Sequence, residues 1–206
     1  MKRIDVVLQS LDTMHIGSGS VGLGGGPILA IQRSQGKPMI PGSTLRGKLR
    51  WNLTRLTPIL RRVATGSLER YFSTFRNDAS VVADFFGVED YRGKLVISDG
   101  RLIAPTPTET LPGVRLDTTR RSVESGALFF HEVVSPGSRF AFEMILDVPD
   151  SLSQEDMIVD MFISLFITKT LEKEGLGRSR ARIAIDLGEH ESTLEEMKEA
   201  LLRDDV

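Results

Sequence analysis

The sequence contains no cysteine among its 206 residues. Disulfide bonds, thiolate metal sites and cysteine nucleophiles are therefore excluded, and a reducing cytoplasm is the expected location. Histidine is scarce, with only three residues, so no metal site or other cofactor is predicted. No apolar run approaches the roughly 18–20 residues of a membrane-spanning helix, and the N-terminus resembles no secretion signal. We therefore expect no membrane partner.

Acidic residues are absent from Thr13 to Leu68, a stretch that carries eight lysines and arginines. Acids gather instead in residues 186–206, where eight of them face only two basic residues. The net charge of −2 alone argues against a nucleic-acid partner. The uneven distribution of acidic and basic residues instead predicts a basic nucleic-acid-binding face and an acidic C-terminal helix at about 190–204.

The spacing of apolar residues predicts an α+β fold in one domain, residues 1–206. Period-two alternation predicts strands at residues 3–14, 94–104, 139–147 and 182–187. With two intervening helices, the order becomes βαββαβ, which is typical of ferredoxin-like and RNA-recognition-motif folds. Residues 105–137 interrupt this order as an insertion with its own hairpin, residues 114–123 against 129–134.

The first helix is predicted to begin at Ser43 as N-cap and to be kinked or ended near Pro58. The second begins at Ser151 or Ser153 and ends at Gly175, with acids early and lysines late, as the helix dipole favours. A last helix is expected behind a capping box of Ser192 and Glu195. Phe85 and Phe86 lie among apolar residues and are predicted to belong to the core.

Six glycines occur within residues 17–26. They spell G-x-G-x-x-G, but a dinucleotide-binding loop must open a helix, and Pro27 follows after three more glycines. So much glycine predicts a loop, because its ordering is entropically costly. Such a loop exposes backbone N–H groups and lets a phosphodiester chain approach closely.

Two segments can place cations beside that loop. Ser43 and Thr44 open a helix that carries Arg46, Lys48 and Arg50, and helix N-termini bind anions. An ordinary capped helix with a solvated basic face explains this segment equally well.

The second segment is Gly177-Arg178-Ser179-Arg180-Ala181-Arg182. On an extended backbone its three arginines would point the same way and would need an anion across them. In a βαββαβ fold, the junction between the first strand and the first helix lies close to the junction between the second helix and the last strand. The two basic segments are therefore predicted to form one groove along an RNA phosphate backbone.

Together these residues resemble the RAMP superfamily, and most closely its Cas7-type backbone subunits of type III CRISPR effectors. The resemblance rests on His15-Ile16-Gly17 with the glycine loop, Ile40-Pro41-Gly42-Ser43-Thr44-Leu45-Arg46-Gly47-Lys48-Leu49-Arg50, Asp84-Phe85-Phe86-Gly87 and Gly175-Leu176-Gly177-Arg178-Ser179-Arg180. It implies a palm with the modified RNA-recognition fold and a protruding thumb, matched here by residues 105–137.

The resemblance also implies partners: CRISPR RNA, target RNA, further copies of the chain and other effector subunits. Arg115, Arg120 and Arg121 of the thumb would then lie near RNA. A plain hairpin packed on the sheet is the alternative for this insertion. His15 is either near RNA or a satisfied histidine at a strand end.

Cleaving relatives carry an aspartate in the glycine loop, ahead of a Pro-Val/Ile string. The matching residues here are Gly24, Gly25 and Gly26, and metal-assisted hydrolysis needs anionic ligands. No catalytic residue is therefore assigned, and the chain is expected to bind RNA without cutting it. Two alternatives stay open: a RAMP ribonuclease using His15 or a relocated acid such as Asp12 or Asp117, and a ferredoxin-like interaction module with no RNA role.

Overall fold

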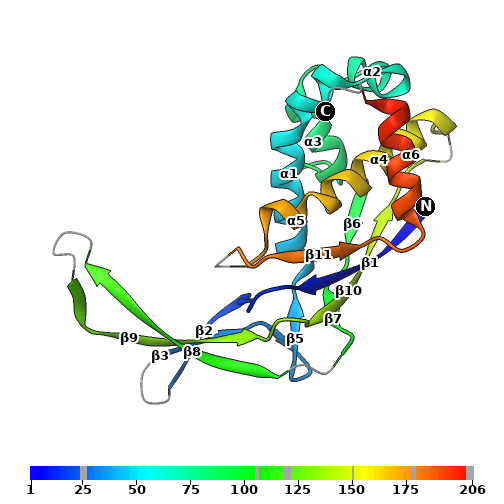
Figure 1. Ribbon diagram of the computed structural model, residues 1–206. Coiled ribbons are helices and arrows are strands. Elements are labelled where there is room, and N and C mark those ends of the chain that lie inside the picture. Colours follow the sequence, from blue (N-terminus) through cyan, green and yellow to red (C-terminus); the bar gives the residue numbers. More distant parts are fainter. Residues whose placement is uncertain (24–26, 105–106, 118–121, 150, 178–179, 203–206) are drawn as a thin grey trace.

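Figure 1 shows the computed structural model, which describes residues 1–23, 27–104, 107–117, 122–149, 151–177 and 180–202. The predicted α+β class is confirmed: helices cover one face of a larger sheet, and a smaller sheet extends away from them. No helix in the described part of the chain is long and apolar enough to cross a membrane.

The larger sheet has seven strands, and every pairing in it is antiparallel. The strands are β1 (Lys2–Ser10), β4 (Arg33–Ser34), β5 (Lys37–Ile40), β6 (Leu95–Ile97), β7 (Gly100–Leu102), β10 (Arg139–Leu146) and β11 (Ile183–Asp186). Their order is β11-β1-β10-β7-β5-β4, with β6 also beside β10. The strand predicted at 94–104 is divided into β6 and β7, and the other three predicted strands are present with shorter bounds.

The inner face of this sheet forms the core. Ile4, Val6 and Leu8 alternate along β1 and are fully or almost fully buried, as are Phe140 and Phe142 on β10. Each methylene removed from water stabilises the fold by about 0.8 kcal/mol. This alternation explains why period-two patterning located these strands correctly.

Six helices pack around that core. They are α1 (Gly42–Val63), α2 (Gly66–Ser73), α3 (Asp78–Phe86), α4 (Gln154–Lys169), α5 (Leu171–Glu174) and α6 (His190–Leu201). Helices α2 and α3 were not predicted. Phe85 and Phe86 are fully buried on α3, so their assignment to the core is confirmed.

Three predicted helix ends need correction. Pro41, not Ser43, is the N-cap of α1, and the helix continues past Pro58 to Val63. Pro58 is exposed, while Leu60 beyond it is buried and stabilises the last turn. Ser192 lies inside α6 and is not its N-cap.

The smaller sheet contains β2 (Gly17–Leu23), β3 (Pro27–Ile31), β8 (Thr108–Asp117) and β9 (Ser122–Val134), in the order β2-β3-β9-β8. The loop predicted at 17–26 is therefore wrong for residues 17–23, because β3 supplies an antiparallel partner. Residues 24–26 lie outside the described part. A hairpin is present as β8 and β9, whose far end reaches away from the helices (Figure 1), but its predicted pairing is wrong. Residues 129–134 pair with 108–113, and the predicted strand 114–123 runs from the end of β8 to the start of β9.

A buried polar cluster joins the start of β6 to the helices. Lys94 Nζ forms ion pairs with Asp84 and with Asp160, the latter at 2.5 Å, and donates to Tyr71 Oη at 2.7 Å. Tyr71 Oη donates to Asp160 at 2.6 Å. Burial is the main cause that raises the pKa of both Tyr71 and Asp160. This cluster fixes α2, α3 and α4 against the sheet.

Candidate nucleic-acid interface

One cavity joins the two segments that the sequence singled out. It measures about 420 Å³ and is lined by His15, Ile16, Gly17, Gly19, Leu29, Ala30, Thr44 and Gly177. Four of these residues, His15, Gly17, Thr44 and Gly177, were predicted at an RNA site. They come from the segment between β1 and β2, the first residue of β2, the start of α1 and a C-terminal turn, which are far apart in sequence. None of the eight lining residues is a carboxylate.

His15 is 6% exposed and has a hydrogen-bonded ring. Its Nδ1 lies 2.6 Å from the backbone carbonyl oxygen of Glu132. Nε2 faces Gly17, where an added Cβ would lie 3.0 Å from that nitrogen. The ring of His131 lies edge-on, with centroids 6.0 Å apart. Nδ1 of His15 is therefore satisfied and the residue lines the cavity, while its role near RNA stays a prediction.

Glu132 was missed by sequence reasoning. Its carboxylate pairs with Arg33 and accepts a 3.2 Å hydrogen bond from the backbone N–H of Ile31, while its own carbonyl holds His15. One residue therefore fixes β3 and the cavity histidine together. No local pattern reveals such contacts, since Glu132 and His15 are 117 positions apart.

The C-terminal segment forms a tight turn. Leu176 and Ala181 exchange backbone hydrogen bonds of 3.0 and 2.9 Å, and Arg180 N–H donates to the Gly177 carbonyl. Gly177 and Arg180 have φ angles of +77° and +50°. The backbone is therefore not extended at Arg180, so the condition on which the predicted alternation of the arginines rested is not met there. Arg178 and Ser179 lie outside the described residues.

Gly177 is packed directly against the first segment. A Cβ at this position would lie 2.6 Å from the backbone oxygen of His15. Only glycine allows this close approach, and its positive φ is also one that other residues rarely adopt. The contact supports the prediction that the two junctions lie side by side.

Arg182 has a partner that the sequence did not suggest. Its guanidinium donates two hydrogen bonds of 2.9 Å to Asp12, and its backbone N–H donates a third of 3.1 Å. These bonds, the side-chain ones first, lower the pKa of Asp12 to about 2. The cation of Arg182 is therefore paired within the chain, and its contact with RNA stays a prediction.

The start of α1 contributes less free positive charge than predicted. The backbone N–H of Gly42 donates to Asp99 at 2.7 Å, so a carboxylate already occupies part of the helix N-terminus. Ser43 is exposed, whereas Thr44 is half-buried and lines the cavity. Lys48 lies 3.7 Å from Glu174.

Arg46 and Arg50 both contact the C-terminus of α3. Arg46 donates to the carbonyl of Phe86, and Arg50 donates to that of Gly87 at 3.3 Å. Helix C-termini favour cations. The two arginines therefore lie on one face of α1, and the partners described for them are uncharged carbonyl groups.

The thumb arginines are the part of the predicted site that is least described. Arg115 belongs to β8, but its side chain lies outside the described part, as do Arg120 and Arg121 altogether. No cluster of three or more potential metal ligands occurs among the described residues.

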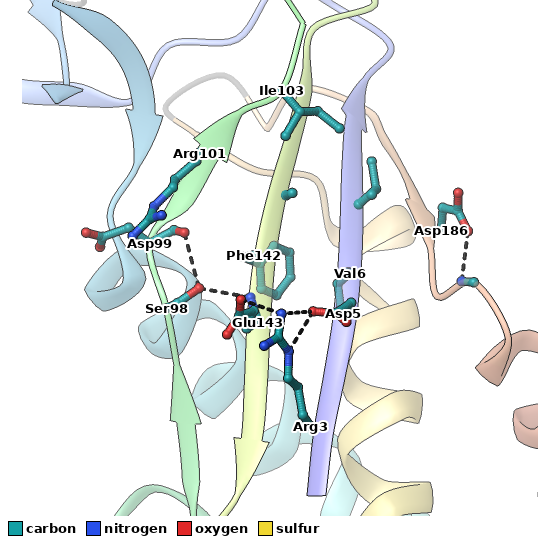
Figure 2. Close-up of a pocket in the computed structure, with 13 residues that line it drawn as sticks. Arg3, Asp5, Val6, Ser98, Asp99, Arg101, Ile103, Phe142, Glu143 and Asp186 are labelled. Carbon is teal, nitrogen blue, oxygen red and sulfur yellow. Dashed lines mark hydrogen bonds and ion pairs between the residues drawn. The ribbon is translucent and has the colours of Figure 1, made fainter. Parts of the chain in front are cut away.

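A larger hollow of about 540 Å³ lies on the sheet face that points away from the core (Figure 2). Figure 2 shows Arg3 between Asp5 and Glu143, with which it forms ion pairs of 3.1 and 2.8 Å. The remaining charged lining residues are Asp99, Asp186 and Arg101. Four carboxylates against two arginines make this hollow poorly suited to phosphate, so the cavity at His15 is the better candidate.

Comparison with known proteins agrees with the motifs. Residues 8–182 match the RAMP superfamily, and the chain belongs to that family.

The chain is 31% identical over 163 residues to "CRISPR system Cms endoribonuclease Csm3" of Mycobacterium tuberculosis strain H37Rv. The alignment covers 70% of this chain and 66% of that relative. The resemblance to Cas7-type proteins of type III CRISPR systems, noted from the motifs, is thereby confirmed.

Proposed function

We propose that this chain is an RNA-binding backbone subunit of a type III CRISPR effector and that it holds RNA without cutting it. The observation that supports this proposal is the cavity that His15, Gly17, Thr44 and Gly177 line together. Glycines at its wall let a backbone approach closely, and Arg180, whose N–H donates to the carbonyl of Gly177, supplies charge for a phosphate. Arg46 and Arg50, on another face of α1, would contact phosphates farther along the RNA. The contacts are sequence-independent, because phosphate groups carry no sequence information.

The larger sheet supports the ferredoxin-like part of this proposal. Strand β1 lies between β11 and β10, and β6 lies on the far side of β10. With α1 between β1 and β6 and α4 between β10 and β11, these four strands form the βαββαβ palm. The β8–β9 hairpin, inserted between β7 and β10, is the thumb.

Absence of cleavage is proposed from the distribution of carboxylates. No Asp or Glu occurs between Asp12 and Glu69 in the sequence. Asp12 is paired with Arg182, and Glu132 is paired with Arg33. Because the relative is named an endoribonuclease, the competing proposal is metal-dependent cleavage by a relocated acid.

The proposed partners follow from the same role. CRISPR RNA would lie along the palm, target RNA would pair with it, and further copies and other effector subunits would complete the assembly in the cytoplasm. The relative's own assembly is not assumed for this chain, which spans 66% of that protein.

Binding of single-stranded RNA against salt concentration tests the first part. The expected result is an affinity that falls steeply with salt and varies little between sequences of equal length. An affinity that is insensitive to salt would contradict a phosphate grip and favour an interaction module without an RNA role.

Incubation of the chain, alone and in its assembled complex, with magnesium and a labelled target RNA tests the second part. We expect intact RNA. Cleavage that Glu132→Gln or Asp12→Asn abolishes, while RNA binding persists, would identify a relocated acid and overturn the non-cleaving proposal.

A further inference from the structure

The hydrogen bond of His15 decides which kind of ligand atom its ring can receive. The carbonyl oxygen of Glu132 only accepts, so the Nδ1 that lies 2.6 Å from it carries the proton. In a neutral imidazole the second nitrogen, Nε2, is then an acceptor. This assignment follows from the hydrogen-bond partner and not from an observed hydrogen.

The ring cannot easily turn to reverse these roles. Its anchor, Glu132, is fixed twice more, by the ion pair with Arg33 and the N–H of Ile31. Nε2 lies beside Gly17, which lines the cavity together with His15. The side chain is only 6% exposed, so Nε2 has limited access to water as a hydrogen-bond donor. The cavity therefore favours a ligand that brings a hydrogen-bond donor to this point.

Phosphate cannot supply that donor, because the oxygens of a phosphodiester only accept. The ribose 2′-hydroxyl can donate, and it is the group that distinguishes RNA from DNA. Gly17, Gly19 and Gly177 line the cavity without side chains and leave room for a sugar. The described lining offers no carboxylate that would compete for the hydroxyl.

We propose that Nε2 of His15 accepts a hydrogen bond from a ribose 2′-hydroxyl and thereby selects RNA over DNA. This inference rests on the proposed RNA-binding function and adds a chemical reason for its specificity. Arginines grip either nucleic acid, whereas the cavity histidine senses the sugar. His15 acts here as a specificity residue and takes no part in bond cleavage.

The test compares three single-stranded oligonucleotides of one sequence: RNA, its 2′-deoxy form and its 2′-fluoro form. The 2′-fluoro form keeps an RNA-like sugar conformation but cannot donate. Binding is measured at about pH 8, where an ordinary imidazole is neutral. The charged or titratable neighbours of the ring are Glu132, its partner Arg33, and His131.

The unmodified protein should bind both modified oligonucleotides about threefold to tenfold more weakly than RNA. This loss of affinity corresponds to the net free energy of one ordinary hydrogen bond. In His15→Phe, which keeps a ring but has no acceptor, the three forms should bind alike. His190→Phe, on the acidic helix α6, should keep the preference of the unmodified protein. Circular dichroism confirms that each variant is folded.

If the 2′-fluoro form binds as tightly as RNA, the hydroxyl donor is not sensed and the inference is wrong, although salt-dependent RNA binding would still support the proposed function. If His15→Phe keeps the preference, another group senses the sugar and the inference is again wrong. If the unmodified protein binds no RNA, both this inference and the proposed function are wrong. Should His15→Phe fail to fold, the 2′-fluoro comparison on the unmodified protein still decides.

Discussion

Replacing Gly177 by alanine tests whether the two junctions truly meet at His15. The new methyl group would lie 2.6 Å from the His15 carbonyl oxygen, whereas carbon–oxygen contacts ordinarily begin at about 3.3 Å. The two backbones must therefore separate by roughly 0.7 Å, or the turn must rearrange. Alanine at a φ of +77° adds about 1–2 kcal/mol of backbone strain.

Gly36→Ala is the matched control, because Gly36 has the same φ of +77° but no atom within 4 Å of an added Cβ. We expect it to cost about 1 kcal/mol, and Gly177→Ala about 3 kcal/mol. Urea unfolding with linear extrapolation measures both free energies. For a chain of this length, about 3 kcal/mol lowers the melting temperature by roughly 6–12 °C.

The difference between the two variants isolates the contact with His15. RNA affinity should fall for Gly177→Ala and stay unchanged for Gly36→Ala, because only the former moves the cavity wall. Equal destabilisation of the two variants would refute the packed contact, and unchanged RNA affinity in Gly177→Ala would refute its place at the site.

Three further outcomes follow from contacts elsewhere. Lys94→Met should lower the free energy of unfolding by about 3–5 kcal/mol, because it leaves the buried Asp160 without its cation. The double variant with Asp160→Asn should recover part of this loss when both are measured by urea unfolding. Asn77→Ala removes the acceptor of the Ser80 N–H at the start of α3 and should cost about 1 kcal/mol in the same assay. Asp12 has a folded pKa of about 2, below its ordinary 3.8, so its stabilising effect is complete above the ordinary value and is lost as pH falls through about 2. The gap in urea midpoint between the unmodified protein and Asp12→Asn should therefore narrow from pH 5 to pH 2, and a constant gap would contradict the ion pair.

Local patterns located the elements whose burial is periodic. The strands β1 and β10 alternate, and the long helices α1 and α4 carry apolar stripes, so each could be predicted from its own residues. Helices α2 and α3 carry the same kind of signal, since Leu68, Tyr71 and Phe72 recur at helical spacing and are buried. Both helices are therefore predictable in principle from their own residues.

Other features depend on contacts that no local pattern contains. Glycine-rich β2 is a strand because β3 pairs with it and because β3 in turn pairs with β9, about a hundred residues away. Arg182 forms an ion pair with Asp12, which lies 170 positions away in the sequence. Fold topology predicted that the segments around His15 and Gly177 meet, and both segments line the cavity. The predicted direction of the arginines in residues 178–182 instead assumed an extended backbone, which the turn after Gly177 does not adopt.

The salt dependence of RNA binding can separate arginines that grip phosphate from those with internal partners. On single strands each neutralised phosphate contributes about 0.7 to the slope of log affinity against log salt. Arg180 is exposed, so Arg180→Ala should reduce the slope by about 0.7. The double variant Asp12→Asn with Arg182→Gln removes an ion pair of no net charge and should leave the slope unchanged. If the double variant instead lowers the slope as much as Arg180→Ala, the Asp12–Arg182 pair must open when RNA binds, and the C-terminal turn would grip phosphate with both arginines.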